Sequence, residues 1–521
     1  MQKAGQSGFS LLRRSLARGF SSQDNPLGHL GALTIFFCWI VLISGIWLLI
    51  FFRTSVSGAF ESVEYLTREQ WYLGGIMRSL HRYASDAAIV TILLHIVKEF
   101  CYDTYRLKRW FSWVTGMPLI WMMFPLGITG YWLVWDELAQ YVAITSAELL
   151  DSLPIFTDSM AANFLSDVSL SDRFFTLMAF LHLIGLPLFL VFGIWLHVFR
   201  LSKPDINPPR SLMAGTLICM LVLSLVFPAE SQSQADLAMV PQTIELDWFY
   251  LHVYPLVQIW SPGWVWVLLL GLSTLVVVAP WLPPGKELPA AKVDLDNCNG
   301  CRRCADDCPF SAIRMEPRSD AQSYELEAVV DSDLCVSCGL CVGACPTATP
   351  FRARSALIPG IDLPDWSAEM LRESIREQAE KLSGDNRVMA FACRSSAALA
   401  QLASAGKAVV EVRCMGQLPP SFIDFVLSRG YADGVLLTGC DGGNCKYRYG
   451  MQWTEQRIFR QRDPRLRKRV NNQRIACGWL QPWSGHGSAL KMHNAFQEYL
   501  DADREAATWR PETARRKAAI R

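Results

Sequence analysis

The chain has 521 residues, of which 51% are hydrophobic, and its formal net charge is only +1. This length allows two to four domains, and the apolar content is too high for an ordinary water-soluble protein. The net charge by itself says nothing about nucleic acid, because the distribution of charge is what matters, and no nucleic-acid partner is expected. The average hides a division, because the long apolar runs stop near Pro284 and a charged, cysteine-rich half follows.

Residues 1–28 form a basic N-terminal segment. It carries Arg13, Arg14 and Arg18, and its first acidic residue is Asp24. This composition faintly resembles an organellar transit peptide. A basic flank on the cytoplasmic side of a membrane explains it more simply, and we expect that role.

Apolar segments long enough to cross a bilayer dominate residues 29–284. Their loops differ in charge, because the loops after the second and fourth segments are basic, whereas the loops at 136–172 and 229–261 are acidic or lack Lys and Arg over most of their length. Basic loops stay in the cytoplasm. We therefore expect an all-α six-helix domain in a bacterial inner membrane, with both termini and the cysteine-rich half cytoplasmic. The six segments lie near residues 30–52, 79–100, 112–134, 174–199, 211–228 and 262–282.

Two of these segments each carry a pair of histidines. His81 and His95 are 14 residues apart, and His182 and His197 are 15 apart. Both spacings come within about 60° of whole helical turns, so each pair lies on one face, about 21 Å apart along the axis. The two helices run in the same direction, so His81 pairs with His182 near the outer surface and His95 with His197 near the inner one. This arrangement fits two haems, each held by one histidine from either helix.

Glycines repeat the same interval on two other segments. Gly31 and Gly45 are 14 residues apart, and so are Gly116 and Gly130. A planar macrocycle needs a gap in the helix wall, which a residue without a side chain provides. Core histidines and ordinary small-residue packing could produce either pattern alone. The two matched patterns together favour haem.

Three further motifs give this half a family resemblance: RSLHRYAS (Arg78–Ser85), GYWLVWDELAQYVAI (Gly130–Ile144) and RFF (Arg173–Phe175). Residues 25–282 resemble the cytochrome b of quinol-oxidising bc-type complexes, and the histidine spacing is similar to that of the photosynthetic branch. The resemblance implies two haems b, Arg82 beside the outer haem, quinone as substrate and a homodimeric core.

A fourth motif, ELDWFY (Glu245–Tyr250), lies where that family carries PEWY. Leu246 and Asp247 replace its proline and glutamate, and Val134 replaces the proline of the family's Pro-Trp pair. Asp247, together with Tyr131, is the candidate quinone site, since a shorter carboxylate can still accept a quinol proton. A solvated loop acid is an equal alternative for Asp247.

The cysteine-rich half opens with two runs, CNGCRRCADDCPF and CVSCGLCVGACPT. Both show the C-x2-C-x2-C-x3-C-P spacing of [4Fe–4S] clusters, in which the fourth cysteine ligates the other cluster. Zinc sites use a different spacing. We expect an α+β ferredoxin-like module over residues 290–355. One cluster would be held by Cys298, Cys301, Cys304 and Cys345, and the other by Cys308, Cys335, Cys338 and Cys341.

Residues 386–485 alternate strand and helix patterns and predict an α/β domain. RVMAFAC, AVVEVRC and GVLLTGC read as strands that end in cysteine, and GCDGGNC supplies glycines that let backbone amides approach cluster sulfur. The region resembles the delta subunit of methyl-viologen-reducing hydrogenase, which passes electrons to heterodisulfide reductase. This implies a [2Fe–2S] cluster, with zinc or free thiols as alternatives. Its four ligands would be Cys393, Cys414, Cys440 and Cys445.

The charged tail at 486–521 predicts a solvated or partner-binding helix. The whole chain predicts an oxidoreductase subunit that links a cytoplasmic enzyme to the quinone pool. Electrons would pass through the [2Fe–2S] cluster, the two [4Fe–4S] clusters, the inner haem and the outer haem. Neither GxGxxG nor GxxxxGK is present, so a flavin is expected on a partner, either a cytoplasmic flavoprotein or heterodisulfide-reductase-like subunits. The alternative is a membrane anchor and docking module whose haems are not catalytic.

Overall fold

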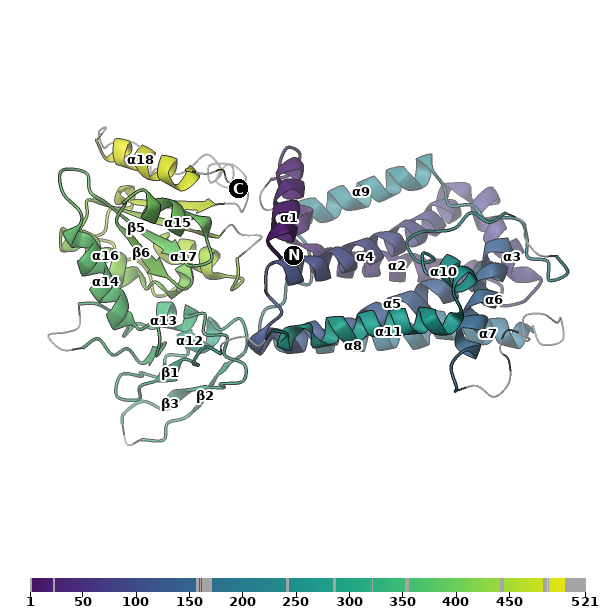
Figure 1. The fold of residues 1–521 in the computed structure, drawn as a ribbon, viewed down its shortest axis with the longest axis horizontal. Coiled ribbons are helices and arrows are strands. Elements are labelled where there is room, and N and C mark those ends of the chain that lie inside the picture. Colours follow the sequence, from purple (N-terminus) through teal and green to yellow (C-terminus); the bar gives the residue numbers. More distant parts are fainter. Residues whose placement is uncertain are drawn as a thin grey trace.

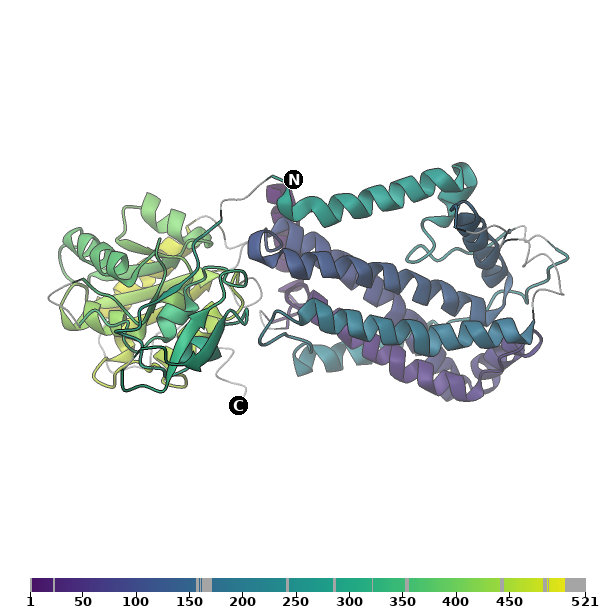
Figure 2. The same cartoon turned by 90° about the horizontal axis from the view of Figure 1, so that it is seen from below.

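The computed structural model describes residues 2–21, 24–155, 159, 161, 171–239, 243–283, 287–320, 322–351, 356–440, 445–480, 485 and 487–501. A bundle of long helices and a smaller body of helices and strands lie end to end (Figure 1). The view turned by 90° has the same arrangement, with the N-terminus at the junction of the two (Figure 2).

Six long helices lie where hydropathy predicts apolar segments. They are α2 (Leu30–Phe51), α4 (Ile76–Cys101), α5 (Trp110–Val134), the continuous run of α7 (Asp172–Phe180), η6 (Leu181–Gly185) and α8 (Leu186–Val198), α9 (Arg210–Val226) and α11 (Pro262–Val278). In the described part of the chain, four helical spans are long and apolar enough to cross a membrane: Leu30–Phe51, Leu107–Val134, Asp172–Val198 and Pro262–Trp281. Helix α9 is shorter, and α4 is not among the four. Six membrane crossings therefore stay a prediction.

Apolar side chains lie both on the outer surface of the bundle and in its interior. On α8, Leu188, Phe189 and Phe192 are exposed, as a face in contact with lipid requires. Inside, Ala84 and Ala88 of α4 are fully buried, and their small size lets the long helices approach closely.

Short elements cover the two ends of the bundle. Helix α1 (Gln2–Leu16) lies at the end that faces the second body, where Phe9 packs in a cluster with Cys101. The acidic loop at the far end contains the helix α6, which packs Ala139 and Val142 into the core of the bundle. The Asp136 carboxylate caps its first turn by accepting a hydrogen bond from the amide of Ala139. The other short elements of the bundle are η1 (Pro26–Gly28), α3 (Gly58–Glu64), η2 (Tyr65–Glu69), η3 (Trp71–Gly75), η4 (Leu107–Arg109), α6 (Glu137–Asp151), α10 (Tyr254–Ile259) and η7 (Ala279–Trp281).

The ferredoxin-like part contains two antiparallel strand pairs and two short helices. Strand β1 (Lys292–Val293) pairs with β4 (Ile361–Asp362), and β2 (Ile313–Pro317) pairs with β3 (Leu326–Val330). Because β4 lies beyond residue 355, this module reaches past its expected end. The helices are α12 (Arg303–Asp306) and α13 (Leu340–Ala344), one within each cysteine run.

The second part of this body is a four-stranded parallel sheet in the order β6-β5-β7-β8. Strand β5 is buried along its whole length, as expected for a parallel sheet covered on both faces. The sequence predicted three strands, and β8 is an addition. The strands are β5 (Val388–Cys393), β6 (Val409–Val412), β7 (Gly434–Cys440) and β8 (Ile475–Leu480), accompanied by α14 (Ala368–Glu380), α15 (Ala397–Ser404), η8 (Met415–Gln417), α16 (Pro420–Ser428), α17 (Gly450–Ile458) and η9 (Asn472–Arg474).

The start of the charged tail differs from the prediction. Helix α18 (Ser488–Asp501) packs Ala489 and Phe496 into a core cluster with Leu436 of β7 and Leu402 of α15. The prediction of a solvated helix is therefore wrong for α18, which completes the covering of the sheet. Residues 502–521 lie outside the described residues.

Candidate functional site

His81 of α4 and His182 of η6 face each other inside the bundle. Their ring centroids are 6.2 Å apart. Metal–imidazole nitrogen distances are about 2 Å, so two rings on opposite sides of one iron have centroids roughly 6 Å apart. The space between the two histidines thus fits a six-coordinate haem iron.

Each of the four predicted glycines lies against one of the four histidines. At Gly45, Gly116 and Gly130 a Cβ would come closer to the imidazole ring than an ordinary contact, so these glycines make room for the ring itself as well as for a macrocycle edge; at Gly31 a Cβ would only touch the ring. This contact adds a second reason for the glycine spacing. The distances from the position of such a Cβ to the ring Cε1 atom are 3.4 Å for Gly31 and His95, 2.9 Å for Gly45 and His81, 3.3 Å for Gly116 and His197, and 3.0 Å for Gly130 and His182.

A π-helical turn reconciles the unequal histidine spacings. The turn η6 spans Leu181–Gly185 and includes His182, whereas His81 and His95 are joined by unbroken α-helix. A π turn contains one residue more than an α turn. The 15-residue interval from His182 to His197 therefore covers the same rotation as the 14-residue interval on α4.

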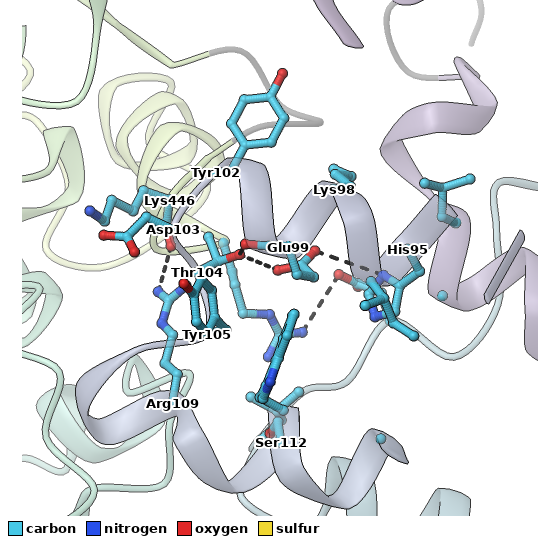
Figure 3. A pocket seen from close by; sticks show the side chains of 18 of the residues that line it. His95, Lys98, Glu99, Tyr102, Asp103, Thr104, Tyr105, Arg109, Ser112 and Lys446 are labelled. Carbon is cyan, nitrogen blue, oxygen red and sulfur yellow. Dashed lines mark hydrogen bonds and ion pairs between the residues drawn. The ribbon is translucent and has the colours of Figure 1, made fainter. Parts of the chain in front are cut away.

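Hydroxyl groups orient three of the histidines. The Nδ1 atom lies 3.1 Å from Ser44 Oγ for His81, 3.1 Å from Thr129 Oγ1 for His182 and 3.4 Å from Thr115 Oγ1 for His197. Partners of this kind fix the ring and leave Nε2 for a metal. The fourth, His95, instead has Glu99, whose Oε1 lies 3.8 Å from Nδ1 (Figure 3).

The predicted quinone-site residues come together near the histidine pair His81 and His182. The Tyr131 hydroxyl donates to Asp247, and Arg82 forms an ion pair with Asp247 at 2.9 Å. Asp247 is only 8% exposed, so the alternative of a solvated loop acid is wrong. Arg82 also pairs with Asp86 at 3.3 Å. Sequence reasoning missed Asp86, although an acid within a membrane segment was a usable signal.

The cysteines of the soluble half gather into the three predicted sets. The first set lines one small cavity together with Gly360. In the second set, burial raises the pKa of the Cys341 thiol, and the neighbouring thiols of that set raise it further. The third set lines another cavity, where the amide of Met415 donates to Cys393 Sγ at 3.1 Å. In the described residues, no three His, Cys, Asp or Glu side chains converge on a position for a single metal ion.

Glycines again make room at the third set. A Cβ on Gly450 would lie 2.1 Å from Cys414 Sγ, and one on Gly439 would lie 2.7 Å from Cys393 Sγ. Gly439 belongs to the GCDGGNC motif, but residues 441–444 of that motif lie outside the described residues. Gly450 was missed, because nothing in its local sequence marks it.

One cavity of about 1370 Å³ joins the two bodies. His95 and His197 line it from the bundle, and Cys440 and Cys445 line it from the sheet domain. At its border Arg109 of η4 donates to the carbonyl of Lys446 at 2.5 Å (Figure 3).

The second cysteine set lies at the same border. The hydroxyl of Ser202, in the loop between α8 and α9, donates to the carbonyl of Cys308 at 2.7 Å, and Lys203 Nζ donates to that of Asp306 at 3.1 Å. The guanidinium of Arg109 lies over the ring of Phe310 at 5.0 Å. The end of the bundle that faces the second body is thus bonded directly to the cysteine-bearing loops.

Family models match three successive parts of the chain. Residues 21–204 match cytochrome b/b6/petB, residues 297–349 match the 4Fe-4S dicluster domain, and residues 388–502 match the delta subunit of methyl-viologen-reducing hydrogenase. These matches confirm the threefold resemblance. The cytochrome b match ends before α9, so residues 205–282 of the expected resemblance lie outside it.

A solved structure described as a hyperthermophilic respiratory Complex III is 20% identical over 49% of this chain and 75% of that chain, with a TM-score of 0.40. The family matches imply haem b and iron–sulfur clusters. The chain therefore combines a helical, cytochrome b-like membrane part with iron–sulfur parts, which supports membrane electron transfer as part of a larger redox complex.

Proposed function

We propose that this chain carries electrons between a cytoplasmic redox enzyme and the membrane quinone pool. Its carriers would be two haems b, two [4Fe–4S] clusters and one [2Fe–2S] cluster, held by the histidine and cysteine sets described above. The observation that carries the proposal is the shared cavity, because His95 and His197 line it together with Cys440 and Cys445. A haem and a cluster held by these residues would border the same space.

The contacts favour a different order of carriers from the one expected from sequence. The Cys304 thiol, of the first [4Fe–4S] set, acts on the pKa of Cys341 in the second, which supports these two sets as neighbours. The second set in turn adjoins the third, because a Cβ on Gly343 would meet the carbonyl oxygen of Gly416, two residues after Cys414. The third set lines the cavity that the two inner histidines also line. We therefore propose that electrons pass between the first and second [4Fe–4S] clusters, then the [2Fe–2S] cluster, and then the inner haem.

The outer end of the bundle supports quinone chemistry. Oxidation of a quinol releases two electrons and two protons. A haem held by His81 and His182 would supply a one-electron acceptor that serves twice, and one proton would go to the protein and the other to water. The carboxylate of Asp247 would accept a proton, and Arg82 would hold that carboxylate in place, as their 2.9 Å ion pair supports. Tyr131, whose hydroxyl donates to Asp247, would orient the same group.

The surroundings of the carriers complete the proposal. The basic loops support a cytoplasmic position for the iron–sulfur half, and the helices would then lie in a bacterial inner membrane. A flavoprotein or heterodisulfide-reductase-like subunits would exchange electrons with the iron–sulfur half. By analogy with bc-type complexes, two copies would form the membrane core.

The alternative, an anchor with non-catalytic haems, differs from this proposal in one measurable respect. Replacing His95 by Ala in the full-length protein should abolish quinone-linked electron transfer in proteoliposomes while all cluster signals persist. Unchanged turnover in a variant that lacks one haem would support the anchor and refute the proposal.

The direction of electron flow has its own measurement. Electron transfer between an outer quinone and the cytoplasmic clusters moves charge across the membrane. Each elementary charge moved corresponds to about 2.3 kcal/mol per 100 mV of membrane potential. A potential-sensitive dye should therefore report a change during turnover, and its sign gives the direction. A constant potential during turnover would contradict a quinone site at the outer haem.

A further inference from the structure

The hydroxyl partners of the histidines follow a rule with one exception. Ser44, Thr115 and Thr129 each directly precede a glycine that packs on the same histidine, so one Ser-Gly or Thr-Gly pair serves each ring. At the fourth position the residue before Gly31 is Leu30, which has no hydroxyl. Among the described residues, no hydroxyl or carbonyl oxygen lies within hydrogen-bond distance of His95 Nδ1.

His95 instead has a charged neighbour, Glu99. It lies one turn beyond His95 on α4, and its Oε1 is the 3.8 Å neighbour of Nδ1. The Thr104 hydroxyl donates to Oε2 of the same carboxylate, so a residue outside the helix holds Glu99 toward the histidine (Figure 3). The inner histidine of α4 is thus the one ligand candidate of the four whose Nδ1 faces a carboxylate.

We propose that Glu99 lowers the midpoint potential of the inner haem by acting through His95. At 3.8 Å the Glu99 carboxylate is too far for a hydrogen bond to Nδ1, but its negative charge still acts on the imidazole and makes Nε2 a stronger donor to the metal. Stronger donation stabilises ferric iron more than ferrous iron. Glu99 is therefore a positioning and tuning residue that touches neither the haem iron nor quinone, and its role rests on the proposed function of His95 as a haem ligand.

The position of Glu99 near the inner haem matters for electron transfer between this haem and the clusters. The inner haem borders the cavity that Cys440 and Cys445 also line. Ferredoxin-type clusters have low reduction potentials. A carboxylate beside a histidine of the inner haem would bring the potential of that haem toward the potential of the clusters. The two histidines of the outer haem have uncharged hydroxyl partners at Nδ1.

A redox titration of the purified full-length protein, followed by its haem absorption bands, tests this inference. Glu99→Gln replaces the carboxylate by an amide of the same size. We expect the midpoint potential of one haem to rise by at least about 59 mV, which for a one-electron couple is a tenfold shift of the equilibrium from ferric toward ferrous iron. The potential of the other haem should stay unchanged. Glu61→Gln, an exposed acid on α3, is the matched control and should move neither potential.

Two further variants keep the test decisive. If Glu99→Gln does not accumulate, Thr104→Val frees the carboxylate and should raise the same potential by a smaller amount, whereas Glu99→Asp keeps the charge and should shift it less than the amide does. Equal shifts of both haems, or no shift in a protein that retains both haems, would overturn the inference. Wild-type protein without haem would refute the proposed function instead, so the two failures are distinguishable.

Discussion

A buried ion pair between the two cysteine-bearing parts allows a strong test of how they depend on each other. Asp307 directly precedes Cys308, and its carboxylate lies 2.5 Å from Nη2 of Arg457 on α17. Both side chains are almost fully buried, at 5% and 1% exposed. Arg462 donates to the other carboxylate oxygen, and Arg457 also donates to the carbonyl of Gly416 at 3.0 Å.

Replacing Asp307 by Asn leaves two guanidinium groups facing an uncharged amide. Breaking a buried pair in this way costs about 3–5 kcal/mol, because the remaining charge stays desolvated. For a body of roughly 200 residues, that cost lowers the melting temperature by about 10 °C. Heating detergent-solubilised protein under anaerobic conditions and following the loss of iron–sulfur absorbance measures this, with the haem bands as an internal reference.

Asp463 supplies the matched control. It also pairs with arginines, at 3.6 Å from Arg303 and 3.3 Å from Arg465, but it is 50% exposed. Exposed pairs contribute about 1 kcal/mol or less. The melting temperature of the Asp463→Asn variant should therefore lie within a few degrees of the wild-type value, because about 1 kcal/mol shifts the melting temperature of a body of this size by only that much. Equal melting temperatures for the two variants would refute the reasoning that burial decides the contribution of Asp307.

Three further predictions concern the carriers directly. Gly130→Val should remove the haem held by His182, since a side chain there collides with the ring, and the pyridine haemochrome assay should then report about one haem fewer per chain. Retention of both haems would contradict the assigned packing. Gly450→Ala should abolish the paramagnetic signal of the [2Fe–2S] cluster while both [4Fe–4S] signals remain, because its Cβ would overlap Cys414 Sγ. In that variant, reduction of the inner haem through the iron–sulfur half should slow at least tenfold in stopped-flow absorbance, and an unchanged rate would disprove the revised order of carriers.

Features that repeat along one element could be read from the sequence. Histidine pairs 14 and 15 residues apart, glycines at the same interval and two cysteine runs all follow from helical periodicity or from cluster stereochemistry. The long helices also lie where their apolar runs predicted them. These signals are local, so no knowledge of the packing was needed to find them.

Features that depend on contacts between elements could not be read in the same way. Glu99 reads as one more charge at a helix end. Only the packing of Gly31 against His95 shows that the residue before this glycine, Leu30, offers no hydroxyl to the ring. Phe496 of α18 lies in a charged stretch, and only the packed sheet shows that it is buried. The order of the cysteine sets relative to the membrane likewise depends on contacts between residues far apart in sequence, such as that between Ser202 and Cys308.

The π turn at Leu181–Gly185 implies that the direction of each histidine depends on the rotation accumulated along the helix, and not on the number of residues between the two histidines. Deleting one residue of this turn downstream of His182 would leave regular α-helix and a 14-residue interval, with both imidazoles still directed at the same neighbours. Adding a residue within the unbroken interval of α4 would instead rotate His81 by about 100° relative to His95. Two related chains with different intervals could therefore hold their haems identically, provided that the longer one contains such a turn.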